Sequence, residues 1–179
     1  MKLKSTLMDK EAVLRSLRRI SHEIIEKNKG TDNLCLVGIL SRGVDIAKII
    51  AENIKIIEGV SINVGVLDIY PHRDDLNEST HTYQNKTDIP FDIEGKNIVM
   101  VDDVLFTGRS ARAGMDALMT LGRPSKIQLA VLIDRGHREL PICANFTGKN
   151  FPTARTELIK VLVDTVDGET GVQLYDTEE

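Results

Sequence analysis

Two adjacent carboxylates, Asp102 and Asp103, follow an apolar run at residues 98–101 and precede a turn of small residues at 107–110. Such carboxylates can hydrogen-bond sugar hydroxyls or hold Mg²⁺, directly or indirectly. The turn, Thr-Gly-Arg-Ser, offers hydroxyls and backbone N–H groups at the start of an expected helix, where the helix dipole attracts phosphate. Residues 97–110 therefore predict a site for a phosphorylated sugar.

The apolar run before the acid pair indicates a buried parallel strand, because a strand covered on both faces is apolar throughout. The acids then fall at the carboxyl end of that strand, where open α/β sheets bind ligands. The chain contains neither a G-x-x-x-x-G-K-[ST] nor a G-x-G-x-x-G phosphate motif. An acid pair that only begins a turn and caps a helix is the less favoured interpretation, since a phosphate-type turn follows it.

Ser41, Arg42 and Gly43 form a second candidate anion site, because they too follow an apolar strand and precede a helical pattern. Alone this tripeptide is weak, since such turns often only connect a strand to a helix. Together with the turn at 107–110 it predicts two phosphate positions, as in a ribose that carries a 5′-phosphate and a 1-diphosphate.

The segment 70–90 contains almost no aliphatic residues and cannot pack as core. Because it directly follows the carboxyl end of an expected strand, we predict a lid over the sugar site rather than a passive loop. Arg73 would then reach a diphosphate when the lid closes, while Asp74 and Asp75 steer metal or the folding of the lid. A solvated charge cluster is the alternative.

Strands and helices alternate around these loops, which predicts a single α/β domain over residues 1–179 with a mainly parallel sheet covered by helices on both faces. We expect strands at 34–40, 60–69, 98–101 and 127–133, helices at 9–29, 44–57 and 111–121, and short tail strands at 158–163 and 172–175. For the tail strands an antiparallel arrangement is open.

The expected helix at 9–29 has one apolar and one basic face. Its apolar stripe, spaced 4-3-4, consists of Val13, Leu17, Ile20 and Ile24. The opposite face carries Arg15, Arg18, Arg19 and His22. Taken alone, such a face is more often solvated than bound to phosphates.

The 179 residues, 41% of them hydrophobic, suffice for one core. No apolar stretch approaches a membrane span, and charges interrupt the first residues before a signal-peptide core could form, so we expect a cytoplasmic protein with no membrane partner. The net charge of −4 argues against nucleic-acid binding over the whole surface. Cys35 and Cys143 lack a C-x-x-C partner, and we expect both to be buried structural thiols.

The acid-pair block resembles the 5-phosphoribosyl-1-diphosphate signature of type I phosphoribosyltransferases. Four more segments resemble the bacterial pyrimidine-operon attenuator family, namely R-I-S-H-E-I-I-E-K-N at 19–28, G-R-P-S at 122–125, I-D-R-G-H-R-E-L-P-I at 133–142 and G-K-N at 148–150. The resemblance implies a protein that binds the leader RNA of pyrimidine genes, senses UMP or UTP, and converts uracil and phosphoribosyl diphosphate to UMP with Mg²⁺.

The resemblance also implies roles for individual residues. Asp102 and Asp103 would hold the ribose hydroxyls and, with Arg73, carry catalysis. Diphosphate would be bound by Ser41, Arg42 and Gly43. The 5′-phosphate would be wrapped by Val104, Leu105, Phe106, Thr107, Gly108, Arg109 and Ser110. The uracil pocket would be formed by the backbone around Ile133, Asp134, Arg135 and Gly136.

For RNA, the resemblance implies a basic concave surface made by a homodimer, whose further assembly is left open. This surface maps onto Arg18, Arg19, His22, Lys27, Ser41, His137, Arg138 and Lys149. Because specific RNA readout usually relies on unpaired bases, the expected target is a hairpin in the leader mRNA.

The lid departs from the family pattern D-I-T-L-Y-R-D-D-L, because Tyr70, Pro71 and His72 replace its T-L-Y. Proline fixes its φ angle and lacks an N–H donor. This departure leaves the efficiency of uracil turnover open, while nucleotide binding as a signal could persist. The alternative to a regulator with enzymatic activity is a plain base-salvage phosphoribosyltransferase without an RNA role.

Overall fold

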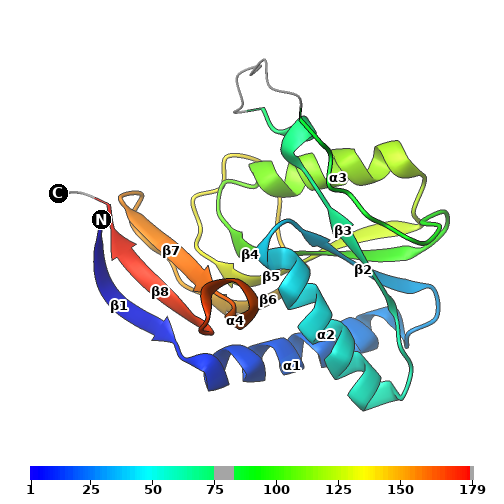
Figure 1. Cartoon of the computed structure of the whole chain (residues 1–179), viewed down its shortest axis with the longest axis horizontal. Coiled ribbons are helices and arrows are strands. Elements are labelled where there is room, and N and C mark those ends of the chain that lie inside the picture. The colour runs from blue at the N-terminus through cyan, green and yellow to red at the C-terminus, as the bar shows by residue number, and fades with distance from the viewer. Residues whose placement is uncertain (75–82, 178–179) are drawn as a thin grey trace.

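The computed structural model describes residues 1–74 and 83–177. A five-stranded sheet forms its centre, with the strand order β3-β2-β4-β5-β6 and every neighbouring pair parallel (Figure 1). The strands are β2 (Leu34–Ile39), β3 (Asn63–Leu67), β4 (Asn97–Leu105), β5 (Lys126–Asp134) and β6 (Phe146–Asn150). The predicted α/β architecture with a parallel central sheet is therefore confirmed.

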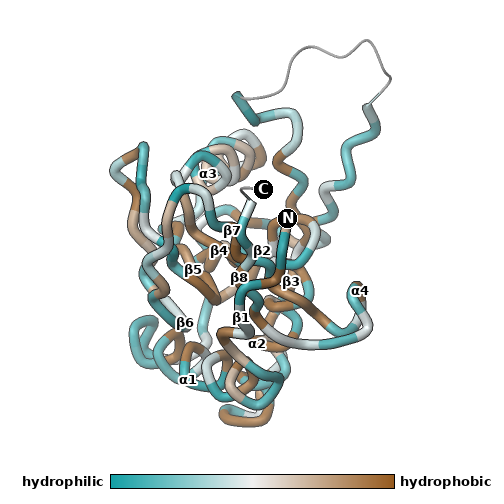
Figure 2. The backbone as a smooth tube through the Cα atoms, turned by 90° about the vertical axis from the view of Figure 1, so that its left-hand side faces the viewer, coloured by the Kyte–Doolittle hydropathy of each residue, from teal (hydrophilic) through white to brown (hydrophobic). Residues whose placement is uncertain are grey.

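Helices cover both faces of this sheet, as expected. Helices α1 (Lys10–Asn28) and α2 (Arg42–Glu58) lie on one face, and α3 (Arg109–Leu121) lies on the other (Figure 1). Because successive side chains of a strand alternate between faces, Val99 and Val101 of β4 pack toward α1 and α2, while Met100 packs toward α3. Figure 2 shows the hydrophobic stretches gathered along these inner strands.

A smaller antiparallel sheet lies beside the main one, with the order β1-β8-β7 (Figure 1). We call it the hood. It comprises β1 (Lys2–Met8), β7 (Glu157–Leu162) and β8 (Gly171–Asp176), with the short helix α4 (Asp164–Asp167) between the last two. Its inward side chains, such as Val161 and Val172, join the core formed by α1 and α2.

The expected tail strands are β7 and β8, and their pairing is antiparallel. Strands β1 and β6 were not predicted. Most residues of β1 are exposed, and β6 buries only Phe146 and Gly148, so neither strand shows a clear apolar pattern.

Helix α1 follows the prediction closely. The side chain of Asp9 caps it by accepting a hydrogen bond from the amide of Ala12 at 2.8 Å. The helix ends at Lys29, which adopts a left-handed conformation just before Gly30. The apolar stripe is buried and the predicted basic residues are exposed.

The expectation of two buried thiols is right for Cys35 and wrong for Cys143. Cys143 lies in the irregular segment between β5 and β6, where its neighbours do not enclose it, and both thiols are free. In the described part of the chain, no helix is long and apolar enough to cross a membrane.

Candidate active site

The acid pair lies where the sheet divides. Strand β2 pairs with β4 only as far as Gly38 and Val101, whereas β4 continues along β5 until Leu105 pairs with Asp134. The predicted strand at 98–101 was too short, because β4 extends through the acids. Asp102 and Asp103 thus occupy the stretch of β4 that has lost its β2 neighbour, at the switch point where open α/β sheets bind ligands.

Two adjoining hollows open at this switch point, and together we call them the cleft. The larger one, of about 380 Å³, lies over residues 104–111. The smaller one, of about 260 Å³, lies over residues 39–42 and the acid pair. Arg73, Asp102, Val104 and Ser110 line both hollows. The structure therefore brings together the two predicted anion sites, the acids and the predicted lid arginine.

The β4–α3 turn, residues 105–110, surrounds the larger hollow. Gly108 has a φ of 93° and caps α3, which begins at Arg109, two residues earlier than expected. The carbonyl of Thr107 accepts hydrogen bonds from the amides of Glu139 and Leu140 at 2.9 and 3.2 Å, so the segment after β5 holds it in place. Among the described residues, the amides of Thr107 and Gly108 have no hydrogen-bond acceptor. Such amides at a helix start are suited to a phosphate.

The first residue of the acid pair, Asp102, has a raised pKa. Burial raises the pKa of the Asp102 carboxyl well above its usual range, and the neighbouring Asp103 carboxylate raises it further. Each carboxylate also accepts a local backbone bond, from Asp103 N to Asp102 at 2.9 Å and from Val104 N to Asp103 at 2.8 Å. A cation or sugar hydroxyl that enters the cleft would relieve the repulsion between the two carboxylates.

We expect Asp102→Asn to stabilise the fold at pH 8. Below the pKa that Asp102 has in the unfolded chain, the carboxyl is neutral in both states, and the stability that this neutral form contributes is fully present. As pH rises through the raised pKa of the folded state, that stability is lost, and the free energy of unfolding falls by about 1.4 kcal/mol per unit of pKa shift. Asparagine removes this loss, so the melting temperature should exceed that of wild type at pH 8 and approach it near pH 4. Thermal melts at both values test this, with exposed Asp32→Asn as the control; equal shifts in the two variants would contradict it.

The Ser41–Arg42–Gly43 site forms the other side of the cleft. Helix α2 begins at Arg42, and the preceding peptide bond, between Leu40 and Ser41, is cis. Gly43 touches β4 directly, since a Cβ atom there would lie 2.4 Å from the carbonyl oxygen of Val101. This contact sets the separation between α2 and the acid pair.

Arg42 is engaged by a residue that sequence reasoning missed. Its guanidinium forms two hydrogen bonds to Asp167 of α4, at 2.8 and 3.2 Å, which link the hood to the smaller hollow. The bonds from Arg42 lower the pKa of Asp167. No local pattern marks Asp167, because 125 positions separate it from its partner.

The predicted lid lies only partly within the described residues, because 75–82, and with them Asp75, fall outside. Its first residues form a 3₁₀ turn, Tyr70–His72, that is tied to α3. His72 Nδ1 pairs with Asp116 at 2.8 Å, and the carbonyl of His72 accepts a bond from Arg112 at 2.9 Å. Asp74 pairs with Arg109, which connects this segment to the β4–α3 turn.

Both arms of that segment meet at Asp68. Its carboxylate accepts bonds from the amides of Tyr70 and Lys86, each at 3.1 Å, and from the hydroxyl of Tyr83. The rings of Tyr70 and Tyr83 stack with centroids 4.3 Å apart. Burial and the Asp68 carboxylate raise the pKa of Tyr83 to about 12. Tyr70, the departure from the family pattern, therefore gains a stacking partner.

The predicted uracil residues adjoin the β4–α3 turn. Ile133 is fully buried, and Asp134 accepts a bond from the amide of Gly136 at 3.0 Å. The Arg135 guanidinium lies 4.0 Å from the centroid of the Phe106 ring and donates to Thr153 and Ala154. Burial lowers the pKa of Arg135.

The predicted RNA residues fall into three places. Arg18, Arg19, His22 and Lys27 are exposed along α1, and Lys149 is exposed on β6. Arg19 joins these two elements, because it donates to the carbonyls of Thr147, at 3.1 Å, and Gly148. His137 and Arg138 lie in the turn after β5, whereas Ser41 lies apart at the start of α2.

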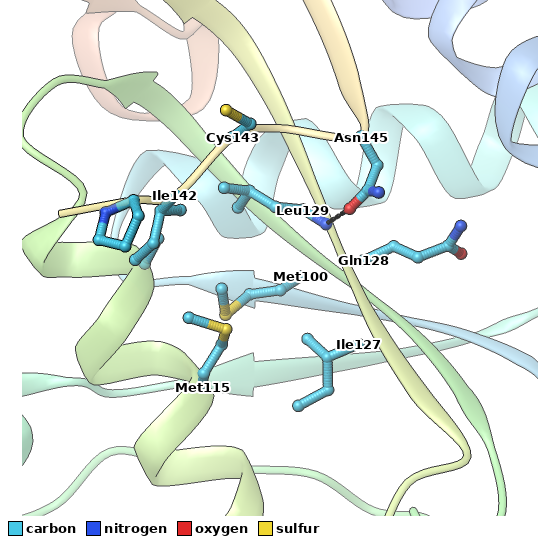
Figure 3. Close-up of a pocket in the computed structure, with 10 residues that line it drawn as sticks. Met100, Met115, Ile127, Gln128, Leu129, Ile142, Cys143 and Asn145 are labelled. Carbon is cyan, nitrogen blue, oxygen red and sulfur yellow. Dashed lines mark hydrogen bonds between the residues drawn. The ribbon is translucent and has the colours of Figure 1, made fainter. Parts of the chain in front are cut away.

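An apolar pocket of about 240 Å³, which sequence reasoning missed, lies between β5, α3 and the segment 141–145 (Figure 3). The side chains of Met100 and Met115 point toward one another there. Asn145 closes one end by accepting a bond from the Leu129 amide at 2.8 Å. Apart from Ala111, its lining shares no residue with the cleft.

Comparison with known proteins agrees with this geometry. Residues 4–153 match the phosphoribosyl transferase domain family. The protein named "Bifunctional protein PyrR" of Caldicellulosiruptor bescii is 60% identical over 167 residues, which cover 93% of this chain and 92% of that one. Its namesake in Thermus thermophilus is 56% identical over 179 residues, covering 99% of each chain.

Among solved structures, the hypoxanthine phosphoribosyltransferase of Trypanosoma cruzi superposes with a TM-score of 0.74 over 98% of each chain at 17% identity. At this identity the likeness shows a shared fold. The domain match and the high identity over nearly the whole length of the curated relatives place the chain in the PyrR family of phosphoribosyltransferases.

Proposed function

We propose that this protein is a uridine-nucleotide-dependent RNA-binding regulator that controls a pyrimidine biosynthesis operon by transcription attenuation, and that it also converts uracil and 5-phosphoribosyl-1-diphosphate to UMP and diphosphate. The observation that carries this proposal is the cleft itself. It brings the carboxylate pair together with the β4–α3 turn and the start of α2, the two predicted anion sites. This arrangement suits a ribose with phosphates at both ends.

Each side of the cleft would perform one task. The amides of the β4–α3 turn would bind the 5′-phosphate, and the Ser41–Arg42–Gly43 site would bind the diphosphate, with Arg73 beside both. Displacement of diphosphate from C1 builds positive charge on the ribose ring, so Asp102 and Asp103 would stabilise that charge and hold the ribose hydroxyls. The backbone at Ile133–Gly136 would receive uracil.

The donor set fits Mg²⁺ that arrives with the substrate. Two carboxylates supply hard oxygen ligands, which Mg²⁺ prefers, while the described residues contain no group of three or more His, Cys, Asp or Glu side chains that could form a complete protein cage. Asp102 and Asp103 would hold the ion together with phosphate oxygens. When bound, it would neutralise the leaving diphosphate.

The RNA surface would run along α1, cross to β6 and reach the turn after β5. The bonds from Arg19 to the β6 carbonyls bring Lys149 beside the basic face of α1. The rings of His137 and Phe106 meet edge-on with centroids 6.0 Å apart, so His137 adjoins the β4–α3 turn. Such a contact could transmit nucleotide occupancy to a leader mRNA hairpin.

We further propose that the protein works in the cytoplasm as a homodimer whose basic faces form one concave surface. UMP and UTP would act as effectors. The lid departure would affect turnover more than binding, because the Asp68, Tyr70 and Tyr83 contacts tie the two arms of the predicted lid together.

We expect Arg18→Ala and His137→Ala to weaken binding of the leader hairpin several-fold, while UMP affinity stays unchanged in Arg18→Ala. For Arg18 the slope of log affinity against log salt should fall by about 1, because one phosphate contact is lost. Hairpin titrations with and without UMP, at several salt concentrations, measure this effect. Arg19→Ala would not isolate the loss of an RNA contact, since Arg19 also binds β6 and pairs with Glu23.

Arg123→Ala is the matched control, because Arg123 is exposed just after α3, the helix that covers the other face of the sheet from α1. Equal hairpin affinity in wild type, Arg18→Ala and His137→Ala would discard the regulatory role. The second candidate would then hold, a base-salvage enzyme without RNA. The observation that favours this second candidate is the pairing of Arg19 with Glu23, because Glu23 neutralises one positive charge of the basic face. Turnover of hypoxanthine but not uracil would support it.

A further inference from the structure

The guanidinium of Arg138 is held by several hydrogen bonds within the protein. It is half-buried in the turn after β5, and its Nη1 donates to the carbonyls of Phe106 at 2.7 Å and Gly136 at 3.2 Å. Its Nε donates to the carbonyl of Ile142 at 3.0 Å, and its Nη2 pairs with the Asp134 carboxylate. Every nitrogen of the guanidinium is therefore engaged inside the protein.

These bonds decide where the carbonyls of the β4–α3 turn point. A carbonyl oxygen turned toward the larger hollow would repel a phosphate, so the turn can bind anions only when its carbonyls face outward. Backbone amides fix two of them, since Arg135 N binds the Leu105 carbonyl and Glu139 N binds the Thr107 carbonyl. Within the described residues, the donor that holds the Phe106 carbonyl is Arg138.

The same side chain shapes the predicted uracil turn. One oxygen of the Asp134 carboxylate accepts the Gly136 amide and the other accepts Arg138, while Gly136 adopts a φ of 80°. Burial alone would raise the pKa of Asp134, but its bonds to Arg138 and Gly136 outweigh burial and lower it. Asp134 thus stays ionised as the partner of Arg138.

We propose that Arg138 is a positioning residue that holds the 5′-phosphate turn and the uracil turn in one arrangement. Its guanidinium therefore supports the affinity for nucleotide and does not contact RNA directly. This inference rests on the proposed function of the cleft. It assigns Arg138 to the pocket side and leaves the RNA surface to α1, Lys149 and His137.

The test compares wild type, Arg138→Ala, Arg138→Lys and the control Arg123→Ala, all as the full chain. Calorimetry with UMP and with ribose 5-phosphate should give dissociation constants at least about tenfold higher for Arg138→Ala. Arg138→Lys should be intermediate, because one ammonium cannot reach carbonyls on both turns and Asp134 together. Hairpin affinity measured without nucleotide should stay within about twofold of wild type.

Chemical rescue separates positioning from a general loss of structure. Methylguanidinium at millimolar concentration should restore UMP binding to Arg138→Ala and leave Arg123→Ala unchanged, whereas a merely destabilised fold would not recover. Dissociation constants for UMP within twofold of wild type in Arg138→Ala, or loss of UMP binding that methylguanidinium does not restore, would overturn the inference alone. Wild-type protein that binds neither UMP nor ribose 5-phosphate would overturn the proposed function with it.

Discussion

Asp103→Asn is expected to abolish most uracil-dependent release of diphosphate from phosphoribosyl diphosphate. The substitution keeps the shape of the side chain but removes the charge that would stabilise the ribose cation and hold Mg²⁺ in the smaller hollow. Loss of one preorganised electrostatic contact typically lowers kcat by about 10²–10³. A diphosphate-release assay with uracil and Mg²⁺ measures the effect.

The fold should survive this change, because the hydrogen bonds of Asp103 among the described residues are to its chain neighbours, the Val104 amide and the Asp102 side chain. Relief of the repulsion with Asp102 should even raise the melting temperature at pH 8. UMP binding by calorimetry is the companion measurement. Turnover of Asp103→Asn within threefold of wild type, with UMP bound normally, would remove the acid pair from the mechanism.

Gly43→Ala should disrupt the cleft from its other side. The added methyl group would lie 2.4 Å from the Val101 carbonyl oxygen and 3.2 Å from the Asp102 Cα, both of them backbone atoms that cannot move alone. Helix α2 must therefore shift away from β4, at a cost of about 1–3 kcal/mol in stability. A displacement near 1 Å between the proposed diphosphate site and the acids can lower the rate by about 10²-fold.

Gly59→Ala is the matched control, because Gly59 ends the same helix with a φ of 71° and open space around it. Alanine there strains the backbone without approaching the cleft. The KM for phosphoribosyl diphosphate should rise in Gly43→Ala and stay at the wild-type value in Gly59→Ala. The same KM in both variants would show that the contact between Gly43 and Val101 does not fix the separation between α2 and the acid pair.

The elements around the cleft that the sequence predicted are those with local patterns. An apolar strand followed by acids and a small-residue turn is readable within 14 neighbouring positions, as at Asn97 to Ser110, and the α1 stripe follows helical spacing. The elements that were missed lack such patterns. Strand β6 is short and polar, yet it brings Lys149 beside α1 because Arg19 reaches its carbonyls.

Side-chain partners were the least predictable part of the site. Arg42 was expected only to bind diphosphate, but Asp167 holds it from the hood. Arg138 was expected to face RNA, but it bonds to the Phe106 carbonyl and to Asp134. These pairings depend on how distant strands come together, which a linear pattern does not encode.

The hood has a consequence for the order in which the molecule assembles. Strand β1 pairs with β8, joining Lys2 to Asp176 across almost the whole described chain, whereas the central strands pair between nearer segments. Closing so long a loop has a high entropic cost, which slows the pairing of β1 with β8. The hood is therefore expected to dock after the parallel sheet has formed. Because Asp167 lies in the hood and binds Arg42, the Arg42 side of the cleft, which we propose binds diphosphate, is expected to reach its final geometry last.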